Sequence, residues 1–205
     1  MPIIPPERSE EAVRALLSGE IVAIPTDTVY GLAASLDHPA AVRRLAELKG
    51  RAADQPIAVL IDTAEAVAQE LDDPAALDRV AGFWPGALTA IVRVRDGDAW
   101  PELVLGNDAK GSPTVGLRVP DDDLARSIIR ACGGALAVTS ANRHDESPAT
   151  SAAGVAAIFG DELLILDGGS RDGGVASTVV DLTSDPPTVL REGAVSAAEL
   201  GLQEI

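Results

Sequence analysis

The sequence is poor in cysteine, aromatic residues and lysine, and it has no long hydrophobic run. Its 205 residues include one cysteine, 2% aromatic residues and two lysines among 16 basic residues. A single cysteine, Cys132, excludes an intrachain disulfide and fits a reducing compartment, so we expect the cytoplasm. No apolar run approaches the roughly 20 residues that span a bilayer, and the first ten residues do not resemble a signal peptide.

Several common catalytic arrangements are also missing. The chain has no GxxxxGK[ST] phosphate loop and no GxGxxG dinucleotide fingerprint. His38 and His144 lack the spacing of metal ligands, and one cysteine cannot build a thiolate site. A Ser-His-Asp arrangement cannot be argued either. We therefore expect no protein-bound metal, and a site that binds and positions its substrates without attacking them covalently.

The charge of the chain is strongly negative, formally −16 at pH 7. Sequence-independent binding to nucleic acid depends on neutralising phosphates, and a surface of this charge should repel them. Any binding to tRNA should therefore be weak or indirect. A small anionic ligand is still compatible with this charge wherever basic residues converge. Lys49 stands out because the chain so rarely uses lysine.

Helix and strand patterns alternate along the chain, with no internal repeat and no low-complexity linker. This order predicts one α/β domain over residues 1–205 with a large mixed sheet. The glycine-rich segment 168–174 reads as a loop and not as a domain boundary. The expected helices are one capped by Ser9 and stopped by Gly19, and those over 38–48, 63–71, 74–81, 121–131 and 152–159. The expected strands are 21–25, 56–61, 87–94, 114–120, 135–140, 162–167, 177–183 and 187–193.

Hydroxyl, amide and basic side chains gather where these strands end. Open α/β sheets bind ligands in crevices beyond strand ends, so this distribution indicates an anionic ligand that forms hydrogen bonds. The places are Thr26, Asp27, Thr28 and Tyr30; Lys49, Gly50, Arg51 and Gln55; Thr114 and Arg118; Thr139, Ser140, Ala141 and Asn142; Ser177 and Thr178; and Arg191.

Each of these clusters has a purely structural alternative. The stretch PTDTVYG could be a turn in which Asp27 and the threonines accept from backbone donors. The sequence KGR could be a helix C-cap with Gly50 in the left-handed conformation. TSAN could cap a turn, and Arg118 or Arg191 could face solvent or pair with one of the 32 acidic residues. Taken one at a time, the clusters leave both interpretations open.

Taken together and in this order, five motifs over residues 25–193 resemble the YrdC-like family of threonylcarbamoyl-AMP synthases. They are PTDTVYGL, KGR…QP, TVGLRVP, TSAN and STVVDLT…VLREG. The resemblance implies a single YrdC-like domain, an α/β (α+β) fold whose large twisted mixed sheet is flanked by helices and carries a positively charged cavity. Because the chain ends soon after REG, it resembles the short form without a C-terminal extension domain.

The resemblance also implies a nucleotidyltransferase activity. L-Threonine, bicarbonate and ATP, with Mg²⁺ on the triphosphate, would give threonylcarbamoyl-AMP and pyrophosphate. A downstream tRNA threonylcarbamoyltransferase would then transfer the group to adenosine 37 of tRNA, which is the t6A modification. The reaction brings several anions together, so clustered lysine and arginine side chains suit it without a protein nucleophile.

Site roles follow from the resemblance, position by position. The implied threonine contacts are Thr26, Thr28, Tyr30, Arg118, Val138 and Ser177. Among these, Arg118 would hold the substrate carboxylate, and Val138 would contribute its backbone. The implied ATP contacts are Lys49, Arg51, Gln55, Thr114, Ser140, Asn142 and Arg191. Lys49 and Arg51 are the expected catalytic residues, because they would neutralise charge on the phosphates.

The chain departs from the family pattern in two stretches. The departures are Ala52 for a proline, Gln55 for an asparagine, Leu60 for a histidine, and residues 144–145 for a Ser-Gly pair. Pro148 falls where a serine contact to ATP is usual, and Arg143 is a candidate to replace that contact. Two alternatives stay open: an RNA-binding or ribosome-maturation YrdC-like protein, and a paralogue that acts on another carbamoyl or acyl adenylate.

Overall fold

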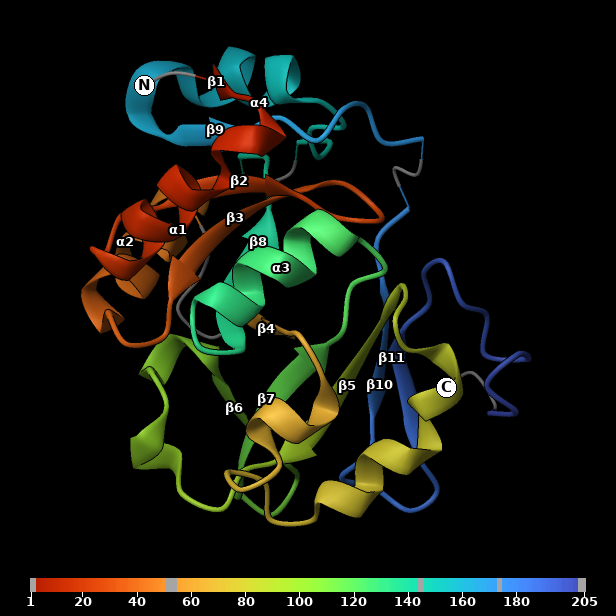
Figure 1. Cartoon of the computed structure of the whole chain (residues 1–205). Coiled ribbons are helices and arrows are strands. Elements are labelled where there is room, and N and C mark those ends of the chain that lie inside the picture. The colour runs from red at the N-terminus through yellow and green to blue at the C-terminus, as the bar shows by residue number, and fades with distance from the viewer. Residues whose placement is uncertain (1–2, 51–54, 144–145, 173–174, 203–205) are drawn as a thin grey trace.

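The computed structural model describes residues 3–50, 55–143, 146–172 and 175–202. All strands in these ranges join one mixed sheet, as the sequence predicts, and this sheet has 11 strands (Figure 1). The strand order is β1-β9-β2-β3-β8-β4-β7-β5-β10-β11, and β6 pairs with β7. The strands are β1 Ile3–Ile4, β2 Val22–Pro25, β3 Tyr30–Ser35, β4 Ala58–Ile61, β5 Leu88–Arg93, β6 Leu105–Asn107, β7 Pro113–Arg118, β8 Ala135–Ser140, β9 Leu164–Leu166, β10 Thr178–Asp181 and β11 Thr188–Arg191.

Parallel and antiparallel neighbours are mixed across the sheet. β1, β9 and β2 run parallel to one another, whereas β2, β3, β8 and β4 follow as antiparallel neighbours. β4 is parallel to β7, β7 is antiparallel to β5, and β5 is parallel to β10. β11 lies at the far edge, antiparallel to β10. The sheet therefore joins strands from both ends of the sequence.

The sequence does not predict three of these strands: β1, β3 and β6. β1 and β6 have only two and three residues. In β3 all six residues are buried, so the strand lacks the alternation of apolar and polar residues that marks a half-exposed strand. It also contains Gly31 and two alanines, which have weak strand propensity. Burial on both faces, and not local preference, places this segment in the sheet.

Within the described residues four α-helices flank the sheet, and the sequence predicts all four. They are α1 Ser9–Leu17, α2 Pro39–Lys49, α3 Asp123–Ala131 and α4 Ala152–Phe159. Asp122 caps α3 by accepting a 2.8 Å hydrogen bond from Ala125 N. Gly50 ends α2 with a φ of 63°, in the left-handed conformation. Ser9 is the first residue of α1, and not the side-chain cap that we expect.

The helices expected over 63–71 and 74–81 are instead short 3₁₀ turns, Ala64–Val67 and Pro74–Arg79. Each turn buries a single residue, Val67 or Leu77, so neither has the apolar stripe that stabilises an α-helix. None of the helices in the described ranges combines the length and apolar character that crossing a bilayer requires. Further 3₁₀ turns are Pro6–Arg8, Ala81–Phe83, Gly97–Ala99, Glu102–Val104 and Gly160–Glu162.

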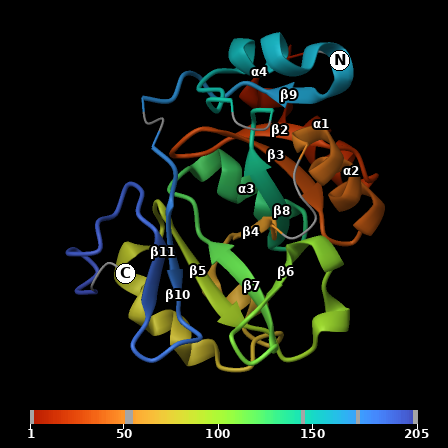
Figure 2. The ribbon, with the colours of Figure 1, turned by 180° about the vertical axis from the view of Figure 1, so that it is seen from behind.

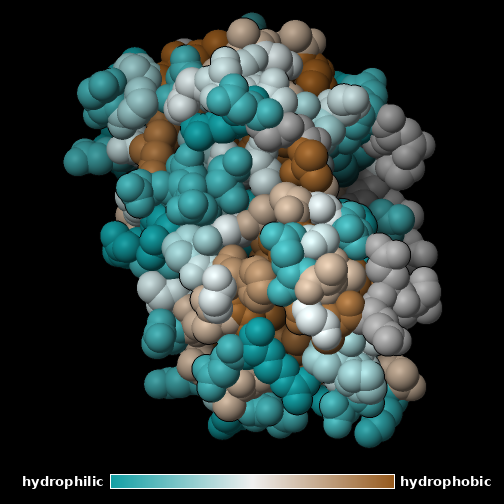
Figure 3. Space-filling view, turned by 90° about the vertical axis from the view of Figure 1, so that its right-hand side faces the viewer, coloured by the Kyte–Doolittle hydropathy of each residue, from teal (hydrophilic) through white to brown (hydrophobic). Residues whose placement is uncertain are grey.

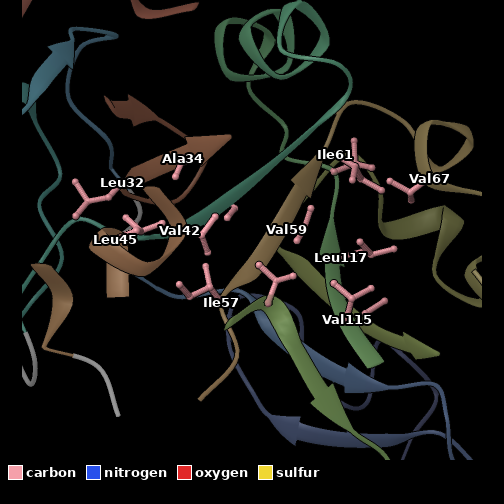
Figure 4. Close-up of a cluster of buried hydrophobic side chains, with 14 of the residues drawn as sticks. Leu32, Ala34, Val42, Leu45, Ile57, Val59, Ile61, Val67, Val115 and Leu117 are labelled. Carbon is pink, nitrogen blue, oxygen red and sulfur yellow. The ribbon is translucent and has the colours of Figure 1, made fainter. Parts of the chain in front are cut away.

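Different helices cover the two faces of the sheet, because successive strand residues point to opposite sides. α1 and α3 pack on the face that carries Val22 of β2 and Ala33 of β3. α2 packs on the opposite face, where Figure 4 shows Val42 and Leu45 beside Leu32 of β3. The sheet is thus a central layer between two apolar clusters.

Figures 1 and 2 show α3 over β8 and β4, while β7, β5, β10 and β11 continue the sheet beyond this helix. On β7, Thr114 and Arg118 point to the α3 side, because Arg118 pairs in register with Leu60, which belongs to the α3-side cluster. Val115 and Leu117 alternate with them and lie in the opposite cluster (Figure 4). The register therefore gives this half of the sheet one apolar face and one polar face.

Candidate active site

A cavity of about 930 Å³ lies on the polar half of the sheet. Residues of β3, β4, β5, β7, β8, β10 and β11 line it, together with the turn between β2 and β3. Figure 3 views the side of the molecule on which β10 and β11 lie, and shows apolar residues between hydrophilic regions. Nine predicted site residues line the cavity: Thr26, Thr28, Tyr30, Thr114, Arg118, Val138, Ser140, Ser177 and Arg191. Segments that are far apart in the sequence therefore converge here.

Arg118 is a buried guanidinium with three hydrogen-bond partners. Its Nε donates to Gly86 O at 2.9 Å, its Nη1 to Thr28 Oγ1 at 3.3 Å, and its Nη2 to Asp27 Oδ1 at 2.6 Å. The side chains of the Arg118–Asp27 ion pair are only 8% and 14% exposed. Because little water screens the two charges, this pair constrains Arg118 more than a surface ion pair would.

Threonine hydroxyls fix the turn between β2 and β3. Thr26 Oγ1 donates to Val29 O at 2.6 Å and accepts from Val29 N at 3.3 Å. Thr28 Oγ1 lies 3.1 Å from Thr26 Oγ1. Since the Thr26 proton is directed to Val29 O, Thr28 is the donor between the two hydroxyls, and it offers lone pairs to Arg118 and the cavity. The structural and ligand-binding interpretations of PTDTVYG thus apply to the same residues.

Ser177 and Arg191 meet on the wall formed by β5, β10 and β11. Arg191 Nη2 donates to Ser177 O at 2.7 Å, and Ser177 Oγ lies 2.9 Å from Thr89 Oγ1. Burial lowers the pKa of the Arg191 guanidinium from its ordinary value, and the nearby positive charge of Arg118 lowers it further. Two cations therefore lie close together, which favours an anionic ligand between or beside them.

Lys49 links the end of α2 to the end of β8. It is 8% exposed, and its Nζ donates to Ser140 Oγ at 3.0 Å and to Asn142 Oδ1. Asn142 is itself fixed, because its Nδ2 donates to the carbonyl oxygens of Arg143 and Glu146 at 2.8 Å. Ser140 lines the cavity and connects Lys49 and Asn142 to it. The KGR and TSAN motifs are thus in direct contact.

Tyr30 is fully buried, and its hydroxyl is already engaged. The hydroxyl donates to Gly169 O at 2.9 Å and accepts from Gly168 N at 3.0 Å. Burial raises the pKa of Tyr30, so the hydroxyl stays protonated at neutral pH. Tyr30 therefore holds the start of the 168–174 segment against β3, while other atoms of the residue line the cavity.

Of the three predicted positions that remain, only Val138 belongs to the cavity lining of the described residues. The register pairs Val138 with Ala33 of β3 and Ala58 of β4, and the residue lies in the cavity lining. Gln55 is exposed and does not belong to the cavity lining. Arg51, with Ala52, lies outside the described residues.

The expected positive charge is concentrated in one part of the cavity and does not extend over all of it. The charged residues of its described lining are Arg118, Arg191, Glu102, Asp108 and Asp181. Asp108 is paired with Arg93 at 2.6 Å, which offsets one of the three carboxylates. The positive region is therefore the neighbourhood of Arg118 and Arg191.

Among the departures from the family pattern, only Leu60 lies in the cavity lining of the described residues. It makes its part of the wall apolar. Arg143, the candidate to replace the contact at Pro148, is not in the described cavity lining, and its guanidinium lies 5.4 Å from the Phe159 ring centroid and 3.8 Å from Glu162.

The structure adds one site residue that the sequence does not single out, Thr89, and one pairing that the sequence does not reveal, that of Asp27. Thr89 is the hydrogen-bonding neighbour of Ser177, and Asp27 is the ion-pair partner of Arg118. A sequence signal exists for Thr89, because it is the one hydroxyl residue in the otherwise apolar start of ALTAIVRV. Asp27 is visible in the motif, but its partner is 91 residues away.

Several known proteins are similar to this chain in sequence. A family profile described as Telomere recombination, Sua5_yciO_yrdC, matches residues 14–193. The chain is 36% identical over 193 residues to the threonylcarbamoyl-AMP synthase of Bacillus subtilis, covering 93% of this chain and 54% of that protein. It is 37% identical over 202 residues to a putative threonylcarbamoyl-AMP synthase of Mycobacterium tuberculosis, covering 96% of this chain and 90% of that protein.

The structure is similar to that of Pyrococcus abyssi Sua5 complexed with L-threonine. The TM-score is 0.86 at 33% sequence identity, and the match covers 98% of this chain and 60% of that one. The chain thus spans little more than half of the Bacillus relative and about three fifths of the Pyrococcus protein. The family profile matches residues 14–193, a range that includes every described residue of the cavity lining, so the chain belongs to the Sua5/YciO/YrdC family.

Proposed function

We propose that the chain is an L-threonylcarbamoyladenylate synthase, a nucleotidyltransferase that uses L-threonine, bicarbonate and ATP. Its products would be threonylcarbamoyl-AMP and pyrophosphate. In the cytoplasm, a downstream tRNA threonylcarbamoyltransferase would use the adenylate for the t6A modification. The observation that carries the proposal is the convergence of Thr28, Arg118, Ser140, Ser177 and Arg191 on one cavity. The names of the two relatives and the threonine bound to the Pyrococcus protein support it.

In this proposal L-threonine binds between the β2–β3 turn and the start of β10. The guanidinium of Arg118 is planar and permanently charged, so it suits the substrate carboxylate. Thr28 Oγ1 offers a lone pair to the ammonium or hydroxyl group of the substrate, and Ser177 Oγ lies on the opposing wall. Thr26 and Tyr30 support the pocket with their hydroxyls, which bond to the backbone around it.

The nucleotide would take the remaining volume. A cavity of about 930 Å³ is large for threonine alone and is within the range of sites for larger ligands. The proposed contacts to ATP are Lys49, Arg51, Gln55, Thr114, Ser140, Asn142 and Arg191. Lys49 would act together with Ser140 and Asn142, since the three side chains already form one hydrogen-bonded unit.

The chemistry needs alignment and charge neutralisation more than a protein nucleophile. The threonine amine adds to CO₂, formed from bicarbonate with loss of water, and gives a carbamate. A carbamate oxygen attacks the α-phosphorus of ATP, the bond from that phosphorus to the bridging oxygen breaks, and pyrophosphate leaves with the electron pair. The cations that converge on the cavity would lower the repulsion between carbamate and triphosphate.

ATP would enter as its magnesium complex. The described residues contain no group of three or more histidine, cysteine, aspartate or glutamate side chains that could hold a metal ion. Mg²⁺ commonly binds through substrate phosphates and retains several waters, which fits a site of this composition. The metal would neutralise part of the triphosphate charge, and the arginines and Lys49 would neutralise the remainder.

The decisive experiment measures pyrophosphate release by the purified protein with MgATP, with and without L-threonine and bicarbonate. We expect release only when both are present. Equal rates with and without threonine would exclude this reaction. Release with another amino acid but not with threonine would favour the paralogue, for which Leu60 is the relevant departure. A salt-sensitive complex with tRNA and no adenylation would favour the RNA-binding alternative, against which the net charge of −16 argues.

A further inference from the structure

The guanidinium of Arg118 is only partly saturated by its protein partners. Arginine has five N–H donors, and the described residues engage three of them, through Gly86 O, Thr28 Oγ1 and Asp27 Oδ1. The partners use Nε and one hydrogen on each terminal nitrogen. One N–H on each of Nη1 and Nη2 therefore remains for a ligand, and a carboxylate can accept from both.

Asp27 is the strongest of the three restraints on Arg118. Its contact is the shortest, at 2.6 Å, and it is the only one that joins opposite charges. Asp27 is itself held in place, because it lies inside the turn that Thr26 closes through Val29. The position of the guanidinium thus depends on a rigid turn of the neighbouring β-hairpin.

The charge of Asp27 also affects the pair of arginines. Arg191 is close enough to Arg118 for their repulsion to lower the pKa of Arg191. Without a counter-ion, the buried guanidinium of Arg118 and the more exposed guanidinium of Arg191 would repel each other more strongly. The carboxylate of Asp27 offsets the charge of Arg118 and so allows both cations to face the same cavity.

We infer that Asp27 is a positioning residue for substrate binding: it orients Arg118 so that two N–H groups point at the carboxylate of L-threonine. This inference rests on the proposed function, because it takes threonine as the ligand of Arg118. Asp27 itself does not touch the substrate. It acts only through the guanidinium of Arg118. Removal of the Asp27 carboxylate should therefore weaken the binding of ligands that carry a carboxylate and leave the binding of other ligands unchanged.

The test compares Asp27→Asn with Asp27→Glu in threonine-dependent pyrophosphate release. We expect Asp27→Asn to raise KM for threonine about tenfold, equivalent to about one weakened charge-assisted hydrogen bond. Its kcat and its KM for ATP should stay within about twofold of wild type. Asp27→Glu keeps the charge but displaces it by one methylene, so its KM for threonine should lie between those of the wild type and Asp27→Asn.

Asp62→Asn is the matched control. Asp62 is also buried and ion-paired, with Arg126 and Arg130, but it does not line this cavity. Its loss should lower the melting temperature and leave both KM values unchanged. The second control is chemical: L-threoninol, which lacks the carboxylate, should inhibit the wild type and Asp27→Asn with the same inhibition constant.

The outcomes separate this inference from the proposed function. A wild type without threonine-dependent release removes the proposed function itself. An active wild type with an unchanged or lower KM for threonine in Asp27→Asn overturns the positioning role alone. Equal weakening of threonine and threoninol also overturns it, because the effect then does not pass through Arg118. If Asp27→Asn does not fold, a wild-type KM in Asp27→Glu is the refuting result.

Discussion

Gly31 is a position where the structure makes a specific prediction about packing. It lies on β3, opposite β8, and its backbone needs no special conformation, because its φ is not in the left-handed region. A Cβ atom added there would lie 2.6 Å from Cγ1 of Val138, a distance that unstrained carbon atoms do not reach. Gly31→Ala should therefore destabilise the protein through overlap alone.

The expected size of this effect follows from the burial of both residues. Val138 is 7% exposed and pairs with β3 and β4, so its backbone cannot move away without disturbing the sheet, and its side chain must leave its present rotamer to relieve the overlap. Overpacking of a well-packed interior costs about 1–3 kcal/mol. A loss of about 2 kcal/mol corresponds to a decrease of about 4–8 °C in melting temperature for a chain of this size.

Thermal and urea denaturation of the variants in a double-mutant cycle would measure this loss of stability. Val138→Ala removes the overlapping methyl group and by itself should cost about 2 kcal/mol. The double variant Gly31→Ala/Val138→Ala should then also lose about 2 kcal/mol, whereas independent effects would add to about 4 kcal/mol. Gly116→Ala is the matched control, since its Cβ would meet Thr89 Cγ2 at an ordinary 3.4 Å. Wild-type stability in Gly31→Ala, or strict additivity in the cycle, would refute the reasoning.

Three further predictions concern the site and the core. Arg118→Ala should raise KM for threonine roughly a hundredfold, because two charge-assisted hydrogen bonds of about 1.5 kcal/mol each are lost; a change below threefold would contradict its role. Lys49→Ala should impair the use of ATP, while threonine should still bind in calorimetry. Normal turnover in this variant would indicate that Lys49 only helps to end α2 and has no role in ATP use. Burial raises the pKa of the Cys132 thiol from 9.0 to about 11, so the folded state retains its proton longer than the unfolded state. The difference in unfolding free energy between the wild type and Cys132→Ala should be constant below pH 9. Towards pH 11 the wild type should lose stability relative to Cys132→Ala. A pH-independent difference would show that the thiol titrates normally.

Most of the regular structure could be predicted because local pattern and tertiary context agree there. α3 is an example: aspartates open it, and Ile128 and Ile129 face the sheet. β3 shows the opposite case, because its small residues have little strand preference and are held by neighbours on both sides. The two 3₁₀ turns after β4 have helix-forming composition but almost no buried face, a property that the sequence does not reveal.

The features of the site also include some that the sequence can predict and some that it cannot. Charged and hydroxyl residues at strand ends can be recognised individually, and the strand register then brings them to one face. Pairing between distant side chains cannot be read in this way: neither the ion pair of Asp27 with Arg118 nor the stacking of Arg143 on Phe159 has a local signal. The contact of Arg143 to ATP stays a prediction, and in this structure its guanidinium lies over an aromatic ring.

The position of β9 has a consequence for biosynthesis. β1 and β2 leave the ribosome early, but the strand that pairs with both of them is Leu164–Leu166. Until it emerges, the nascent polypeptide presents the open edge of β2 to other proteins, and such edges are templates for aggregation. Translation that stalls before this point would release a polypeptide that cannot close its own sheet and must depend on chaperones or be degraded.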